Sequence, residues 1–285
     1  NPNENTHVIL TTARAFPKPV KEYEVKQETW LDAPKSAWLI KVSGNDMAVV
    51  EKLERSPSRL GDLCTINQGL RTGDNERYLS SVPKSGKWKS AAGGKHVGRY
   101  EPLAKVVYVY YDPSVLDAPR RREIFESAEK LVVQEIRNIT LPRRLVATYD
   151  DQRFFCLQST NVINLRNLEH QTRSVVFLLG ILNSNAANFF FRLRFSGNNH
   201  IASNQLARIP IPASNEKQYD DVVSLVEQML DLHKRLAATQ NANEQERLRR
   251  LIDSTDAQID ALVYELYELT PEEIAIVEDG QAKRG

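Results

Sequence analysis

The segment INQGLRTGDNERYL, residues 66–79, combines amide and guanidinium side chains with two glycines on one loop. Asparagine and glutamine can each make two hydrogen bonds to adenine, and arginine can make two to guanine, so this composition could read base edges in DNA. The glycines, Gly69 and Gly73, would let the backbone approach a groove closely. The candidate base contacts are Gln68, Arg71, Asn75 and Arg77. Taken alone, the loop is more typical of an ordinary turn whose polar side chains face water.

Three further segments add positive charge: PKSGKWKS at 83–90, GGKHVGRY at 93–100 and RNITLPRR at 137–144. Loops rich in lysine and arginine suit phosphate contacts, which orient a protein on a duplex without reading its sequence. The candidate phosphate contacts are Lys87, Lys89, Lys95, Arg143 and Arg144. Trp88 could stack on a base or fill a core pocket, and the second role is the more common one for tryptophan.

The net charge of +1 conceals a strong asymmetry along the chain. Residues 60–212 contain 21 basic and 13 acidic residues, a balance of +8, whereas residues 213–285 contain 8 basic and 16 acidic residues, a balance of −8. A basic body beside an acidic end suggests two parts with different partners. Charge alone does not decide between an anionic partner and two surfaces that are merely solvated.

The sequence contains no motif that would carry catalysis or hold a cofactor or metal. GLRTGD and GGKH lack the spacing and composition of a phosphate-binding loop, and no G-x-S-x-G occurs. The five histidines have no partner at a zinc-binding spacing. Glu135 and Arg137 match a nuclease arrangement poorly because a lysine is missing, and Asp150 with Asp151 is interpreted as a hairpin turn. We therefore expect no catalytic residue, no cofactor site and no metal site within this chain.

Two further features bear on the setting of the protein. Cys64 and Cys156 lie far apart in the sequence, which argues for a reducing compartment, the cytoplasm, and against a disulfide framework. The longest apolar run, Val175–Leu182, has eight residues. A bilayer requires about 20, so we expect no membrane contact. No signal-peptide pattern follows the first residue, and we expect the chain to begin inside a longer polypeptide.

Hydrophobic periodicity predicts an α+β fold: a mixed α/β recognition domain followed by an antiparallel helical hairpin. VVYVYYDP, residues 106–113, is β-branched and aromatic and is typical of a strand. The apolar segment 172–195 is too long for a strand, so we expect a helix with a break near Asn183. Two apolar stripes between Tyr219 and about Tyr267 predict the hairpin.

We accordingly divide the chain into three parts. Residues 1–37 are expected to be a linker or the end of a preceding domain, residues 38–212 a DNA target recognition domain, and residues 213–285 the hairpin and tail. The acidic hairpin would then be a spacer, a dock for other domains or a stabilising cap. Shorter expectations are extended segments for SAWLIKV (36–42), LGDLCTI (60–66) and IASNQLARIPIP (201–212), and a helix for DMAVVEKLER (46–55).

The chain also resembles a known family. The blocks that carry the resemblance are LGDLCTINQGLRTGDNERYL, GKHVGRYEP, FESAEKLVVQEI, LVATYDDQRFFCLQSTNVI, LLGILNSNAANFFFR and ARIPIP. In this order and spacing they look like the TaqI-like C-terminal specificity domain of large bacterial restriction-modification and phage-defence enzymes. The ending IDALVYELYELTPEEIAIVE is similar to the C-terminus of many of these enzymes, so the resemblance covers roughly residues 38–278.

The resemblance implies a domain that reads double-stranded DNA and follows an adenine-specific methyltransferase, with its S-adenosylmethionine site and Asn-Pro-Pro-Tyr motif, in a longer chain. Neither the site nor the motif is recognised here, since NPNE at the start is a different sequence. Base-reading residues in the family vary with the target, so the candidates above depend on chemistry and loop position alone. A protein-interaction module with a basic docking surface is the alternative. An RNA-binding module ranks last, because the tyrosines of VYVYY alternate as in a strand core.

Overall fold

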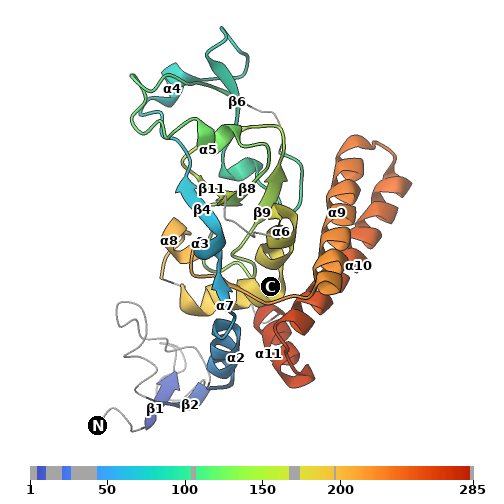
Figure 1. The fold of residues 1–285 in the computed structure, drawn as a ribbon. Helices are drawn as coiled ribbons and strands as arrows, with labels where there is room; N and C mark the ends of the chain where they lie inside the picture. Colours follow the sequence, from blue (N-terminus) through green and yellow to red (C-terminus); the bar gives the residue numbers. More distant parts are fainter. Residues whose placement is uncertain are drawn as a thin grey trace.

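The computed structural model describes residues 5–10, 21–26, 44–103, 107–166, 174–195 and 197–282. It confirms the α+β class: two four-stranded sheets lie beside a group of helices (Figure 1). An antiparallel pair, β1 (Asn5–Leu10) and β2 (Lys21–Lys26), lies in the part expected to be a linker. The expected strand SAWLIKV falls outside the described residues.

The central sheet has the strand order β4-β11-β8-β9, and its neighbouring strands are all antiparallel. The strands are β4 (Cys64–Gln68), β8 (Lys130–Gln134), β9 (Ala147–Asp150) and β11 (Thr160–Leu165). Side chains alternate between the two faces of a strand. In β8, Leu131 and Val133 therefore pack into one hydrophobic core, while Val132 packs into a second.

A second sheet covers the second core and has the order β10-β6-β7-β5. Its strands are β5 (Leu79–Ser80), β6 (Trp88–Ala92), β7 (Val107–Tyr110) and β10 (Phe155–Cys156). Val109 is fully buried, whereas Tyr108 and Tyr110 are only half-buried, so the expectation of a tyrosine core for this strand was wrong. Val109 instead joins the second core, which also contains the rings of Phe125 and Phe155.

Three helices pack against the other face of the central sheet or against one another: α2 (Gly44–Glu54), α6 (Val175–Asn183) and α7 (Asn185–Arg194). The expected break near Asn183 is confirmed, because Ser184 ends α6 and caps α7 through a hydrogen bond from the Ala187 amide at 3.1 Å. Among the described residues, no single helix is long and apolar enough to cross a membrane, although α6 and α7, bent by 64°, reach that composition as a pair.

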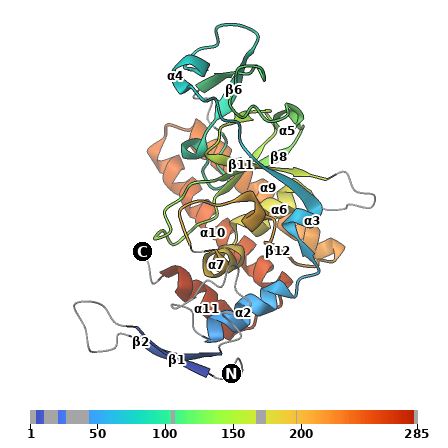
Figure 2. The same ribbon diagram turned by 90° about the vertical axis from the view of Figure 1, so that its left-hand side faces the viewer.

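The C-terminal part contains the expected antiparallel hairpin, α9 (Glu216–Ala238) and α10 (Ala242–Leu266), followed by α11 (Pro271–Ala282). The hairpin has no core of its own, because its apolar stripes join the core that contains α2, α6 and α7. Gly180 permits this close packing: a Cβ there would lie 2.8 Å from a methyl carbon of Val226. In Figures 1 and 2, α2, α7 and α11 lie together at the end of the molecule away from α4 (Asn75–Tyr78).

Two segments expected to be extended contain short helices, α3 (Leu60–Leu63) and α8 (Ser203–Leu206). They lie side by side because the neighbouring strands β3 (Ser58–Arg59) and β12 (Pro210–Ile211) pair with each other. Backbone hydrogen bonds from Leu60 to Ile209 and from Gly61 to Ala207 hold the two segments together at 2.9 Å. These partners are about 150 positions apart, which is why local alternation did not predict the helices.

The acidic pair in YDDQR does not form the expected hairpin turn. After Asp150 the chain crosses from the central sheet to the second sheet, where β10 pairs with β6. The Asp150 carboxylate accepts hydrogen bonds from the amides of Gln152 and Phe154, at 2.8 and 2.9 Å, and forms a fully buried ion pair with Lys130. The Asp150 carboxylate thus holds the start of this connection through its two amides and through Lys130.

Candidate nucleic-acid interface

A cleft of about 310 Å³ opens where the loop after β4 meets the ends of β8 and β10. The residues that line it are Gln68, Leu70, Arg71, Thr72, Asn75, Glu135, Ile136, Leu157, Gln158, Ser159 and His200. Three of the four predicted base contacts, Gln68, Arg71 and Asn75, are therefore brought together in one cavity. The cleft offers amide, guanidinium, carboxylate and imidazole groups within a small space, a mixture that suits the donor and acceptor pattern of base edges.

Gln68 and Glu135 form the polar floor of this cleft. The Gln68 amide nitrogen donates hydrogen bonds to Glu135 Oε1 at 3.0 Å and to the Gln158 carbonyl at 3.3 Å. His200 Nδ1 lies 3.1 Å from the same carboxylate oxygen. The Glu135 side chain is thus held between two polar neighbours while it remains largely buried.

Arg71 and Asn75 also line the cleft and lie in the loop after β4 and at the start of α4. The backbone of Arg71 is fixed by two hydrogen bonds with Ala118, both 2.9 Å long, and its guanidinium forms an ion pair with Asp117. The Arg71 side chain is 56% exposed, so water screens this pair and the guanidinium remains accessible. Thr72 donates a hydrogen bond to Asn75 Oδ1 at 2.6 Å and so orients the Asn75 amide.

The fourth predicted base contact, Arg77, does not line the cleft. It lies on α4, where its guanidinium carbon is 5.3 Å from the centre of the Tyr78 ring. The helix begins with a cap, since the Arg77 amide donates a hydrogen bond to Asp74 Oδ1 at 3.0 Å. Arg77 is therefore an exposed cation beside the cleft, in a position that suits a phosphate as well as a base.

The predicted lysine contacts lie on the second sheet and next to it. Lys87 is exposed and pairs with Asp112 at 2.7 Å; this hydrogen bond raises the pKa of Lys87 and lowers that of Asp112. Lys89 is half-buried on β6, and Lys95 is exposed on the short helix η2 (Gly94–His96). Lys95 differs from Lys87, which is also exposed, in that it forms no ion pair with another of the described residues.

Trp88 neither stacks freely in solvent nor fills a core pocket. It is half-buried, and its ring meets Tyr110 edge to face with centroids 5.7 Å apart. The Lys84 ammonium lies 5.1 Å from the centre of the Trp88 ring. Tyr78 stacks on Tyr110, with ring centroids 6.2 Å apart. These residues form a cation–aromatic cluster on the outer face of the second sheet.

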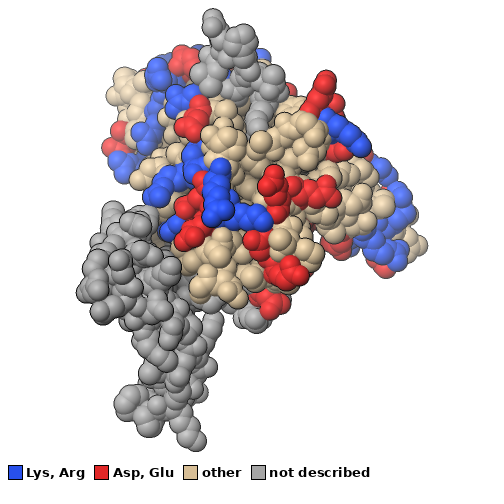
Figure 3. Space-filling model, turned by 60° about the horizontal axis from the view of Figure 1, so that its bottom comes forward, with Lys and Arg blue, Asp and Glu red and all other residues tan. Residues whose placement is uncertain are grey.

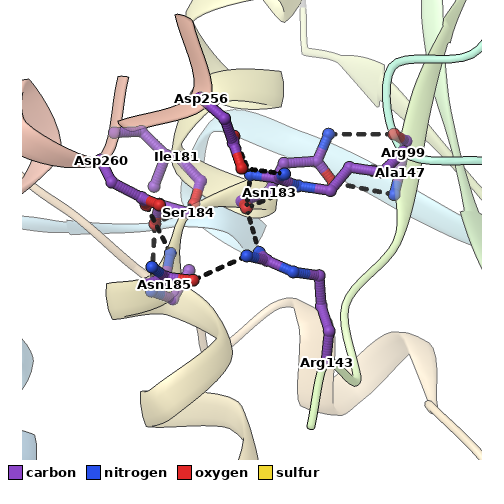
Figure 4. Close-up of polar contacts among 10 residues, drawn as sticks. Arg99, Arg143, Ala147, Ile181, Asn183, Ser184, Asn185, Asp256 and Asp260 are labelled. Atoms are coloured by element: carbon purple, nitrogen blue, oxygen red, sulfur yellow. Dashed lines mark hydrogen bonds and ion pairs between the residues drawn. The ribbon is translucent and has the colours of Figure 1, made fainter. Parts of the chain in front are cut away.

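Arg143 and Arg144 are corrections to the predicted phosphate contacts. Arg144 is only 1% exposed and donates from Nη2 to the Asn198 carbonyl at 3.0 Å, so its side chain does not reach a phosphate in this conformation. Arg143 donates to the Asn183 carbonyl and to Asn185 Oδ1, each at 2.6 Å (Figure 4). Both arginines are structural because they satisfy carbonyl and amide oxygens at the break between α6 and α7 and in the loop after α7.

The same break is the centre of a polar network that ties the hairpin to the sheet (Figure 4). The Asn183 side chain bonds both the amide and the carbonyl of Ala147 in β9 at 3.0 Å. Arg99 donates to the Asn183 carbonyl and forms a two-pronged ion pair with Asp256 of α10. Asp260 of α10 accepts a hydrogen bond from the Asn185 amide at 2.7 Å. Docking of the acidic hairpin thus uses Arg99 from the basic segments directly, while Arg143 holds the break between α6 and α7.

Asp260 should make the stability of this network depend on pH. Burial raises the pKa of its carboxyl from an ordinary 3.8 to about 6, so the folded protein holds this proton more tightly than the unfolded chain does. The stabilisation is complete below about pH 4 and is lost as pH rises through about 6. The Asp260→Asn variant keeps the acceptor for Asn185 but has no proton to lose. Urea unfolding of both proteins should show the wild type losing stability relative to the variant over this window; parallel curves would contradict the prediction.

The C-terminal part carries the acidic charge on α10 and α11, where residues 251–282 contain nine Asp or Glu and no Lys or Arg. A cavity of about 540 Å³ between α7, α10 and α11 is larger than the cleft described above, but Asp253, Asp256, Asp260, Glu265 and Glu278 contribute to its lining. Acidic side chains gather beside a smaller group of basic ones on the face shown in Figure 3. Such a cavity would repel a phosphate backbone. Among the described residues, no group of three or more His, Cys, Asp or Glu could hold a metal ion.

Gly69 and Gly73 have distinct roles in the loop. A Cβ at Gly69 would lie 2.2 Å from the Leu157 carbonyl oxygen, because the chain passes directly against β10 at this point. Gly73 adopts a φ of +79°, which favours glycine. The close backbone approach that we attributed to a DNA groove is therefore, at Gly69, an approach to the protein's own backbone.

The Gly69→Ala variant should lose about 1–3 kcal/mol of unfolding free energy, the range typical of overpacking, because a carbonyl cannot rotate away as a side chain can. The shift should also distort the cleft that Gln68 and Leu157 line. Thermal unfolding would measure the first effect. Gly86→Ala is the matched control, since nothing lies within 4 Å of a Cβ at Gly86. Equal melting temperatures for the two variants would contradict this account.

Sequence reasoning did not include Glu135, Gln158 or His200 among the candidate contacts. Glu135 was considered only as a nuclease carboxylate, and His200 only as one of five unpaired histidines. They lie 67, 90 and 132 positions from Gln68, so no spacing rule would have placed them beside it. The weak local signal is a polar run, SGNNH at 196–200, of the kind typical of a functional loop.

Comparison with protein families matches residues 89–211 to the TaqI-like C-terminal specificity domain. These residues are therefore similar in sequence to a TaqI-like specificity domain. The match includes β6, β7, β8, β9, β10 and β11 and the helices α6 and α7, that is, most of both sheets and the bent helix pair. The matched residues thus contribute Glu135, Gln158 and His200 to the cleft, while the loop that holds Gln68, Arg71 and Asn75 precedes them.

Among solved structures, the fold is similar to that of the Type IIL restriction-modification enzyme MmeI, described in complex with DNA. The TM-score is 0.54 and the sequences are 13% identical. The similarity covers 80% of this chain and 36% of the MmeI chain, so this chain spans about a third of that protein. At this identity the likeness shows a shared fold and no more. No curated protein matches the chain.

Proposed function

We propose that this chain reads the sequence of double-stranded DNA and directs a restriction-modification enzyme to its sites. The observation that carries the proposal is the cleft, in which Gln68, Arg71 and Asn75 meet Glu135 and His200 beside a TaqI-like specificity domain. Arginine, asparagine and glutamine are the side chains that pair with purines through two hydrogen bonds, and a carboxylate can accept a hydrogen bond from cytosine.

The surroundings of the cleft supply positive charge for the sugar-phosphate backbone. Arg77 and Lys95 are exposed on short helices, and Lys87 and Lys89 lie on or next to the second sheet. Such contacts would set the orientation of the protein on the duplex and make binding depend on salt. The acidic helices α10 and α11 would stay off the DNA and hold the recognition domain in place.

We further propose that the reaction directed by this chain is adenine-specific DNA methylation in the cytoplasm, catalysed by a methyltransferase in another part of the same polypeptide, with or without a fused endonuclease. The proposal is supported by the family of residues 89–211 and by the likeness to MmeI, of which this chain covers 36%. S-adenosylmethionine would be bound by that other part, since the sequence here contains no Asn-Pro-Pro-Tyr motif.

The proposal is tested by selection of bound duplexes from a random library with the full-length protein, followed by sequencing of methylated adenines in cells that express it. One short consensus should emerge from both experiments. Single-stranded RNA and heparin serve as competitors at two salt concentrations. Selection of no consensus, together with the absence of methylated sites, would contradict the proposal and favour the alternative, a basic surface that docks an acidic protein.

A further inference from the structure

The loop between β8 and β9 exposes three large apolar side chains within six residues. Ile136 is 51% exposed, and Ile139 and Leu141 are each 38% exposed. Among the described residues, the other large hydrophobic side chains exposed to this degree are Val82 and Val115, which lie elsewhere in the chain. Single exposed hydrophobic residues are normal on protein surfaces, but a cluster of this kind marks a surface that another molecule covers.

This apolar loop, residues 136–141, is held in a defined position. The Ile139 amide donates a hydrogen bond to Asn199 Oδ1 at 3.0 Å, and the Arg137 amide donates to the Asn199 carbonyl at 2.9 Å. Arg137 also spans the base of the loop, from Nε to the Arg143 carbonyl at 2.6 Å. The three exposed side chains therefore lie on a loop whose backbone is held by hydrogen bonds, which presents them in one arrangement.

The apolar loop begins at the wall of the cleft. Ile136 itself lines the cleft and forms an isolated antiparallel bridge with His200. A duplex whose base edges reached Gln68 and Glu135 would therefore bring its base pairs against Ile136. The next two apolar side chains follow on the same loop, where they would meet the neighbouring base step.

We propose that Ile136, Ile139 and Leu141 form an apolar wedge that enters between base pairs next to the recognised bases, unstacks that step and bends the duplex. This inference rests on the proposed function and adds deformation of the DNA to it. Apolar side chains inserted at base steps kink DNA by about 20–90°, and the bend allows more protein surface to be covered. The alternative, an apolar contact with a thymine methyl group, would require only one such side chain, whereas this loop exposes three.

The wedge adds a second source of specificity to the cleft. Flexible pyrimidine–purine steps are unstacked at lower cost than stiff ones, so a wedge selects sequence at positions that no polar side chain contacts. The selected consensus should therefore include a flexible step immediately beside the positions that depend on Arg71 and Asn75.

The test uses the full-length protein and the duplex that it selects. The duplex carries either dyes at its two ends, to report bending, or 2-aminopurine at successive positions, to report unstacking by a rise in fluorescence. The wild type should bring the dyes closer and raise the fluorescence at one step. The Ile139→Ser/Leu141→Ser variant leaves the cleft residue Ile136 in place. It should lose both signals and bind more weakly, while the bases selected at the cleft stay the same.

Val82→Ser/Val115→Ser is the matched control, because it removes two exposed apolar side chains that do not line the cleft. It should keep the bend and the fluorescence rise. All three proteins should unfold at similar temperatures, since the substituted side chains are exposed. If the Ile139→Ser/Leu141→Ser variant unfolded early, Ile139→Ser alone would be compared instead.

Two results would overturn the wedge and leave the proposed function intact: a selected duplex that stays straight and stacked with the wild type, or a bend that survives in the wedge variants. Loss of activity without any change in DNA binding or bending would also overturn it, and would indicate that the apolar loop docks another part of the protein. Failure of the wild type to select any duplex would instead contradict the proposed function itself.

Discussion

Replacement of Lys130 by methionine should lower the free energy of unfolding by about 3–5 kcal/mol, the range found when one partner of a buried ion pair is removed. Lys130 and Asp150 are 0% and 1% exposed, and their charged atoms lie 2.5 Å apart. Lys130 also donates to the Phe125 carbonyl at 2.7 Å. Methionine would leave the Asp150 carboxylate buried without a counter-charge, with two backbone amides as its remaining hydrogen-bond donors.

Urea unfolding followed by circular dichroism would measure this effect. The Lys130→Met/Asp150→Asn double variant should recover part of the loss, because it removes the uncompensated charge and keeps an oxygen acceptor for the amides of Gln152 and Phe154. Lys87→Met is the matched control: Lys87 forms an ion pair of similar length, 2.7 Å, but is exposed, so its loss should have little effect. If Lys130→Met and Lys87→Met behaved alike, burial would not be what makes the first pair important.

The second large effect separates base contacts from phosphate contacts. Arg71→Ala in the full-length protein should cost about 1–3 kcal/mol at the preferred site and relax the preference at one position, because it removes a contact with two hydrogen bonds. Lys95→Ala should weaken binding to all sequences alike and lower the dependence of log K on log salt by about 1. Binding to the selected duplex and to single-base variants of it, at several salt concentrations, would measure both effects.

Asp117→Asn is the control for Arg71, since Asp117 is its ion-pair partner and contributes no group to the cleft. This variant should keep the preferred sequence. The assignment of the loop as a reader would be wrong if Arg71→Ala and Lys95→Ala weakened every sequence equally. Arg143 is unsuitable as the phosphate variant, because it bonds the Asn183 carbonyl and Asn185 and its loss would disturb the fold.

Much of the secondary structure followed from the sequence because helices and some strands leave a local signal. The apolar stripes of α9 and α10, the long apolar segment of α6 and α7 and the β-branched run of β7 lie within single windows of the chain. The polar pair Asn183 and Ser184 marked the break between α6 and α7 because serine caps a helix. Composition and loop position also supplied the candidates for contact with DNA, which stay predictions.

Only the tertiary structure decided which of these side chains are free to do so. Arg143 and Arg144 look like surface cations in the sequence. In the structure, Arg143 donates to the Asn183 carbonyl at the break between α6 and α7. Arg144 is buried and donates to the Asn198 carbonyl in the loop after α7. Tyr110 resembled a core residue, but in β7 it is Val109 that faces the second core, while Tyr110 is only half-buried. The cleft joins residues up to 132 positions apart. Burial and partner choice depend on such distant contacts, and no local window of sequence contains them.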